Sequence, residues 1–175
     1  MIPGKPMAHL FLIADVNLGA AASRFEALRA TLLSILAPSI APATNFDIQH
    51  IGSTAVPGCL TKGDLDLCVR APLVLFAQCE TALAAALARN EGSLHTPTLA
   101  SFIFAPNTAN EAGIQLVAAG SEHDTFVLFR DLLLANPALV QDYNALKQSW
   151  HNKPMDAYRE AKSHFVEAAI KNHIK

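Results

Sequence analysis

The stretch from His50 to Arg70 reads H-I-G-S-T-A-V-P-G-C-L-T-K-G-D-L-D-L-C-V-R and decides the fold of this chain. Within it, Asp64 and Asp66 are two residues apart in a segment with the alternating character of a strand. Carboxylates at positions i and i+2 of a strand point to the same face. Because close carboxylates repel each other, this pair suits a divalent cation such as Mg²⁺, which binds oxygen ligands and keeps its bonds to substrate phosphates.

The Gly52-Ser53 pair precedes these acids and supplies the second half of the pattern. Backbone N–H groups in such a turn, together with the serine hydroxyl, offer hydrogen bonds to phosphate oxygens. The alternatives are a tight turn that needs glycine only for its backbone and a solvent-facing edge strand for Asp64 and Asp66. We interpret the segment as half of a phosphoryl-transfer site, with metal at the two acids and phosphate at Gly52 and Ser53.

Two further residues of the segment have open roles. Lys62 either binds a phosphate or neutralises the neighbouring acids. For His50 we favour a buried, hydrogen-bonded side chain over an acid–base role. The other histidines are scattered without paired spacing, so we expect no histidine metal cluster.

Composition limits the class of protein. The chain has 175 residues, of which 51% are hydrophobic and 16% charged, which indicates one core-rich globular domain and excludes a disordered chain. The net charge of −2 gives no general attraction to nucleic acid or to anionic membranes, so we expect neither as a partner. A local basic patch is left open by the basic residues of the C-terminal part, which are Lys147, Lys153, Arg159, Lys162, Lys171 and Lys175.

The cysteines and the apolar runs point to the cytoplasm. The three cysteines form no C-x-x-C spacing, which fits a reducing compartment better than disulfides or zinc. Residues 1–12 lack the basic and long apolar regions of a signal peptide. No apolar run reaches the roughly 18–20 residues that a membrane span needs.

Hydrophobic periodicity predicts the order of elements. Helices are expected over 20–37, 73–89, 125–135, 137–150 and 155–172, and strands over 46–51, 65–69, 101–105 and 114–118, with a short strand or extended arm over 7–13. This order predicts an α/β domain with a small mixed sheet. The sheet-containing core would span 1–120, and C-terminal helices would span 121–175.

Several separated strings carry a family resemblance. They are H-I-G-S-T-A-V-P-G at 50–58, F-R-D at 129–131, N-P at 136–137, Y-x-x-L-K at 143–147 and A-Y-x-x-A-K-x-x-F at 157–165. With Lys62, Asp64 and Asp66 at matching spacing, the chain resembles the GrpB family, a branch of the nucleotidyltransferase superfamily. The resemblance implies that fold, a nucleoside triphosphate or other phosphorylated small molecule as partner, and Mg²⁺ as cofactor. It also implies phosphate contacts from Arg130, Lys147 and Lys162.

Departures from the family pattern leave the activity open. The family's Asp-Pro-x-Trp corresponds to Asp15-Val16-Asn17-Leu18, and its later His-x-His strand corresponds to Gly113 and Gln115. Active members of the superfamily place a third carboxylate on that strand. One hypothesis is therefore an Mg²⁺-dependent nucleotidyltransferase, the second a nucleotide- or phosphate-binding module without turnover, and the third a helper domain for a partner protein. Glu111 reaching Asp64 and Asp66 would favour the first.

Overall fold

The computed structural model describes residues 10–15, 17–39 and 46–173. Its core is a five-stranded mixed sheet. In spatial order its strands are β2 (Asp47–Ile51), β3 (Leu65–Ala71), β6 (Ala112–Ala118), β5 (Leu99–Phe104) and β4 (Ala88–Arg89). β3 and β6 run parallel, and the other neighbours are antiparallel. The α/β class and the mixed sheet expected from the sequence are thereby confirmed.

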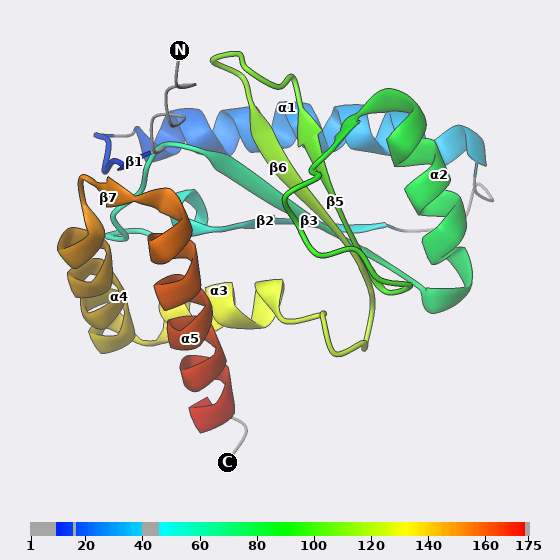
Figure 1. Cartoon of the computed structure of the whole chain (residues 1–175). Coiled ribbons are helices and arrows are strands. Elements are labelled where there is room, and N and C mark those ends of the chain that lie inside the picture. Colours follow the sequence, from blue (N-terminus) through cyan, green and yellow to red (C-terminus); the bar gives the residue numbers. More distant parts are fainter. Residues whose placement is uncertain (1–9, 16, 40–45, 174–175) are drawn as a thin grey trace, which may run out of the picture.

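Two helices cover one face of the sheet (Figure 1). They are α1 (Leu18–Leu36) and α2 (Phe76–Ala86), and their apolar stripes pack on the β3 and β6 side chains that alternate towards them. α1 begins at Asn17, whose side chain accepts a hydrogen bond from the Ala20 amide at 3.1 Å. This apolar layer holds the strands that carry the predicted site.

The remaining helices lie on the opposite side of the sheet and at its end (Figure 1). α3 (Phe126–Ala135) packs on the face formed by Ile51, Cys68 and Val117, and α4 (Pro137–Trp150) and α5 (Met155–His173) follow it. Asn136 accepts hydrogen bonds from the first amides of α4, as the Asn-Pro pair predicts. β1 (Leu10–Phe11) pairs with β7 (Lys153–Pro154), and residues 7–9 of the expected N-terminal strand lie outside the described residues.

The prediction of one helix over 73–89 was wrong at both ends. Residues 73–75 form a 3₁₀ turn, the helix spans Phe76–Ala86, and Ala88–Arg89 forms edge strand β4. Arg89 pairs with Glu80 at 2.7 Å and lies over the Phe102 ring of β5. These tertiary contacts and strand pairing outweigh the helix propensity of the alanine run.

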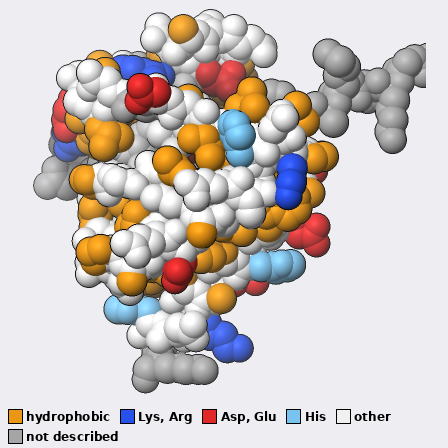
Figure 2. Space-filling model, turned by 90° about the vertical axis from the view of Figure 1, so that its left-hand side faces the viewer, with side chains coloured by type: hydrophobic (Ala, Val, Ile, Leu, Met, Phe, Trp, Pro, Cys, Tyr) orange, Lys and Arg blue, Asp and Glu red, His pale blue; other side chains and the backbone are white. Residues whose placement is uncertain are grey.

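The surface carries no broad basic area in the part of the chain seen in Figure 2. That view faces α4, β1 and β7, and basic, acidic and hydrophobic side chains are interspersed on it. Among the C-terminal basic residues that could have formed a local basic patch, Lys147 is only 1% exposed and Lys175 lies outside the described residues. Among the described helices, none combines the length and the apolar character needed to cross a membrane.

Candidate functional site

The end of β2 and the start of β3 bring the Gly-Ser turn to Asp66. The two strands are antiparallel, and their register places Ile51 opposite Asp66. Gly52 follows at once with a φ of +73°, a left-handed backbone that favours glycine, and Ser53–Ala55 then form a short 3₁₀ turn. The turn and the acid are therefore neighbours because of local strand pairing.

The Asp66 carboxylate occupies a slot between two glycines. A Cβ placed on Gly52 would lie 2.6 Å from Asp66 Oδ2, and one placed on Gly113 would lie 2.7 Å from Oδ1. Gly113 is the β6 residue paired with Asp66 in the parallel ladder. Neither position has room for a side chain while Asp66 keeps this place.

Burial and a neighbouring charge act on Asp66 together. Burial and, to a smaller extent, the charge of Asp64 raise the pKa of Asp66 to about 6, although Lys162 and Lys62 oppose the rise. A buried carboxylate with a raised pKa lacks full charge compensation, so a bound cation near it would be stabilised. Asp66 therefore has the electrostatics of a group that accepts a metal ion.

Asp64 directly precedes the first residue of β3. Its Oδ2 lies 2.5 Å from Lys62 Nζ, with both side chains more than one-third exposed. The pair fits the alternative in which Lys62 neutralises the acids. Because the pair is exposed and charge-balanced, Lys62 can leave Asp64 at low cost when another cation arrives.

A cavity of about 490 Å³ opens beside Asp66 and collects most of the predicted site residues. The ones that line it are Gly52, Ser53, Asp66, Gln115, Arg130 and Lys162. Asp64, Lys62 and Lys147 are not among its lining residues. One wall is apolar and includes Phe126, Phe129 and Leu133 of α3.

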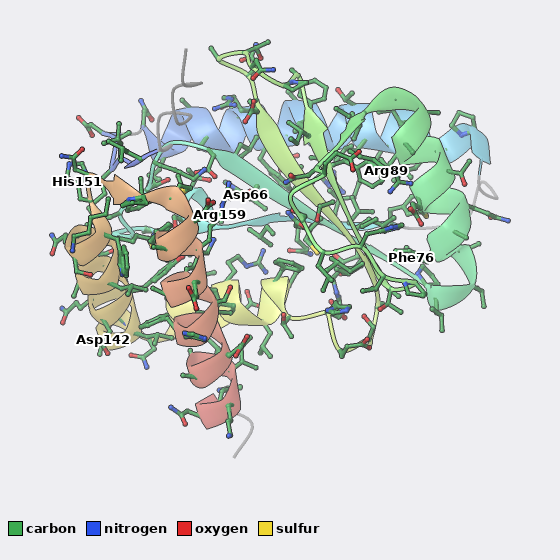
Figure 3. All side chains as sticks on the ribbon, viewed as in Figure 1. Asp66, Phe76, Arg89, Asp142, His151 and Arg159 are labelled. Atoms are coloured by element: carbon green, nitrogen blue, oxygen red, sulfur yellow. The ribbon has the colours of Figure 1, made fainter. Side chains whose placement is uncertain are left out.

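Helix α5 adds polar side chains that we did not predict from the sequence. Arg159, Ser163 and Glu167 line the cavity together with Lys162. Figure 3 labels Arg159 on α5 and Asp66 on the sheet, both of which line the cavity, and shows Asp142 on α4 well away from them. Residues 159, 162, 163 and 167 recur at helical spacing on one face. That spacing around Lys162 was the signal in the sequence that would have found them.

Arg130 is fixed at the cavity by contacts on β2. Its Nη1 donates to Gln49 Oε1 at 2.9 Å and to the His50 carbonyl at 2.8 Å. Its Nε and Nη2 pair with Asp131. The side chain is 15% exposed. These contacts tie α3 to the sheet and hold a guanidinium at the cavity wall.

Lys147 is buried behind the Gly-Ser turn. Its Nζ donates to Ser53 Oγ at 2.5 Å, to Cys59 Sγ at 3.2 Å and to the Leu60 carbonyl. The ammonium also lies 3.9 Å from the centre of the Tyr143 ring. The lysine thus meets both ends of the loop that carries Ser53.

The later strand brings no acid to Asp64 and Asp66. Gln115 lies on β6 at the cavity, where its Oε1 accepts a hydrogen bond from Ser101 at 2.5 Å. Glu111 turns to the hairpin loop, where Oε2 accepts from the Asn107 amide at 2.7 Å. Within 10–15, 17–39 and 46–173, no three His, Cys, Asp or Glu side chains gather to hold a metal.

His50 and the tyrosines behave as structural residues. His50 is half-buried, meets Thr54 Oγ1 at 3.0 Å and stacks on Phe25, which confirms the hydrogen-bonded interpretation. Burial, then the charge of Arg130, lowers the pKa of His50. Tyr143 and Tyr158 are 2% and 4% exposed, so both pack inside the molecule.

The family follows from comparison with known proteins. The family model described as GrpB protein matches residues 20–172. This chain belongs to the GrpB family. The match confirms the resemblance seen in the string at 50–58 and in the C-terminal strings.

Similar proteins extend this result. A UPF0157 protein of Vibrio cholerae is 40% identical over 127 residues, which are 70% of this chain and 65% of that protein. This chain thus spans less than two-thirds of the length of that curated relative. The crystal structure of GrpB from Enterococcus faecalis matches 94% of this GrpB chain and 100% of its own, with 19% identity and a TM-score of 0.70, and shows the same fold. A mutant of the Cid1 poly(U) polymerase bound to MgATP matches more weakly, with 16% identity, coverage of 77% and 42%, and a TM-score of 0.48.

Proposed function

We propose that the cavity beside Asp66 binds a nucleoside triphosphate together with Mg²⁺. One observation carries this proposal. A Gly-Ser turn, the half-buried carboxylate of Asp66 and two cations from different helices, Arg130 and Lys162, line a single cavity. That combination suits a metal-bound polyphosphate better than either a neutral ligand or a free metal ion.

The metal end would be held by Asp66 and Asp64. Asp64 lies two residues before Asp66, and its charge is one cause of the raised pKa of Asp66. Carboxylate oxygens are the ligands that Mg²⁺ prefers, and Mg²⁺ keeps waters and phosphate oxygens in its remaining positions. When bound, the metal would neutralise phosphate charge. The lysine on Asp64 would then be released to the phosphates.

The phosphate end would lie between the Gly-Ser turn and the basic side chains. Gly52 and Ser53 offer an amide and a hydroxyl, and Arg130, Arg159 and Lys162 offer positive charge from α3 and α5. Hydrogen bonds from charged donors to phosphate oxygens are about twice as strong as neutral ones. The apolar wall of α3 would accommodate the nucleoside end of the ligand.

Nucleotidyl transfer is the second candidate function. It is favoured by the D-x-D pair next to the Gly-Ser turn, the pattern that the superfamily uses. In this reaction an acceptor hydroxyl attacks the α-phosphorus, pyrophosphate leaves with the bridging oxygen, and the hydroxyl proton passes to solvent. Positioning and charge stabilisation would supply most of the rate. Active members of the superfamily have a third carboxylate on the strand that corresponds to β6, whereas Gln115 gives β6 a neutral side chain at the cavity. Ligand binding is therefore better supported than nucleotidyl transfer.

Calorimetric titration separates these possibilities. ATP, GTP, CTP and UTP are titrated into the full chain with and without Mg²⁺, and pyrophosphate release is measured for each. We expect at least one triphosphate to bind more tightly with Mg²⁺, and Asp66→Asn to remove that Mg²⁺ dependence. Asp142→Asn, a change at an exposed residue of α4 away from the cavity, is the matched control and should bind as the wild type does. The proposal would be contradicted if no triphosphate bound. Pyrophosphate release would establish nucleotidyl transfer, the second candidate function.

A further inference from the structure

The ammonium of Lys147 is enclosed by protein. The residue is 1% exposed, although it lies on α4, most of whose polar side chains face solvent. Lysine is rarely buried unless its charge is paired, because burial removes its hydration. Its contacts therefore have to replace water. They do so with three acceptors, Ser53 Oγ, Cys59 Sγ and the Leu60 carbonyl.

These three contacts use the full donor capacity of the lysine. An ammonium group has three N–H donors and no acceptor. Each of them is directed to the loop between β2 and β3, and the Tyr143 ring covers the remaining side at 3.9 Å. Lys147 therefore has no N–H left for a ligand in the cavity, and it does not line that cavity. Lys147 can therefore affect a ligand in the cavity only through the loop between β2 and β3.

The contact with Ser53 determines how that hydroxyl is used. Because Lys147 cannot accept a hydrogen bond, Ser53 Oγ is the acceptor in this pair and its own proton points elsewhere. Ser53 lines the cavity, as does Tyr143, whose hydroxyl also neighbours Ser53. The Ser53 proton is thus left for the Tyr143 hydroxyl or for an acceptor that a ligand brings into the cavity. A hydroxyl that accepts from a cation is also polarised and becomes a stronger donor.

We propose that Lys147 is a positioning residue that makes the Ser53 hydroxyl a hydrogen-bond donor to a phosphate oxygen of the bound ligand. This inference rests on the proposed function, because it concerns how the same cavity holds a triphosphate. It assigns Lys147 a different role from the direct phosphate contact expected from the sequence. The cation acts on the ligand through one serine and through the loop that it fastens at Ser53 and at Leu60.

A double-mutant cycle in ligand affinity tests this role. The probe is Mg²⁺ with the tightest binder among ATP, GTP, CTP and UTP, and the proteins are the wild type, Ser53→Ala, Lys147→Met and the double variant. Each single change should weaken binding about tenfold, the value of one charged hydrogen bond. The double variant should bind within about twofold of either single variant, because both changes remove the same contact. Lys153→Met, a change at an exposed lysine on β7, should bind as the wild type does.

Other outcomes overturn the inference in distinguishable ways. Full binding by Ser53→Ala, or additive losses of about a hundredfold in the double variant, would show that Lys147 does not act through Ser53. No binding by the wild type would instead remove the proposed function and this inference with it. If Lys147→Met fails to fold, the comparison of wild type with Ser53→Ala decides. The serine variant must then lose affinity for the triphosphate and keep its affinity for the matching nucleoside.

Discussion

Asp66 and Gly113 fit together because Gly113 has no side chain. A Cβ on Gly113 would lie 2.7 Å from Asp66 Oδ1, closer than such atoms approach in proteins. The two residues are paired across the parallel strands β3 and β6, so neither backbone can move away without disturbing the centre of the sheet. The place of the central carboxylate is thus set by a glycine that is distant in sequence.

Replacing Gly113 should therefore destabilise the fold and displace Asp66. We expect Gly113→Ala to lower the free energy of unfolding by about 1–3 kcal/mol, as other insertions into packed sites do. Combining it with Asp66→Ala should recover part of that loss, because the clashing carboxylate is gone. Urea unfolding measures both. Gly92→Ala, whose Cβ would meet only Asn90 at 3.7 Å, should change stability by less than about 0.5 kcal/mol.

Asp66 should make stability depend on pH. The pKa of Asp66 is raised from 3.8 to about 6 in the folded state. Its contribution to the free energy of unfolding is therefore fully present below pH 3.8, where the carboxyl is protonated, and is lost as the pH rises through 6. At about 1.4 kcal/mol per pKa unit, the loss reaches up to about 3 kcal/mol. Asp66→Asn should then be more stable than the wild type at pH 7.5 and similar to it near pH 4. Urea unfolding of both proteins at several pH values from 4 to 7.5 measures this difference. Equal free energies of unfolding for Asp66→Asn and the wild type at pH 4 and at pH 7.5 would contradict the prediction.

An ion-pair network should hold the turn that leads into α3. Arg70 on β3 donates twice to Asp124, both at 2.7 Å, and once to Asp47 at 2.6 Å. The Asp124 side chain is only 6% exposed and also accepts from the Gly120 amide. We expect Asp124→Ala to lower the free energy of unfolding by about 2–3 kcal/mol. Asp156→Ala, which breaks an exposed pair with Arg159, should cost less than about 0.5 kcal/mol in the same thermal or urea unfolding experiment.

Arg130 should not be replaceable by lysine. Its guanidinium reaches Gln49, the His50 carbonyl and Asp131 at once, a fork that an ammonium cannot reproduce. If it also contacts phosphate, Arg130→Lys should weaken triphosphate binding about tenfold, and it should lower the melting temperature as well because contacts between α3 and β2 are lost. Arg29→Lys on α1 is the control. Equal affinity of Arg130→Lys and wild type would place the phosphates elsewhere in the cavity.

The features that sequence reasoning found were mostly local ones. Gly52 and Asp66 are brought together by two adjacent antiparallel strands, so their proximity follows from short-range patterning. The slot at Gly113 depends on the register of β3 with β6, which joins distant segments and has no local signal. Lys147 was expected at the ligand because its string Y-x-x-L-K at 143–147 resembles the family. Its burial depends on acceptors in a loop far away in the sequence.

The central claim is that a metal–triphosphate complex binds in the cavity beside Asp66, whose carboxylate lies between Gly52 and Gly113. Manganese in place of magnesium, added with the tightest of ATP, GTP, CTP and UTP, broadens the amide signals of residues near it in a ¹⁵N-labelled protein. We predict triphosphate-dependent broadening at Gly52, Ser53 and Gly113, none at Gly92, and loss of the effect in Asp66→Asn. Broadening confined to exposed carboxylates away from the cavity, or unchanged in Asp66→Asn, would contradict the claim.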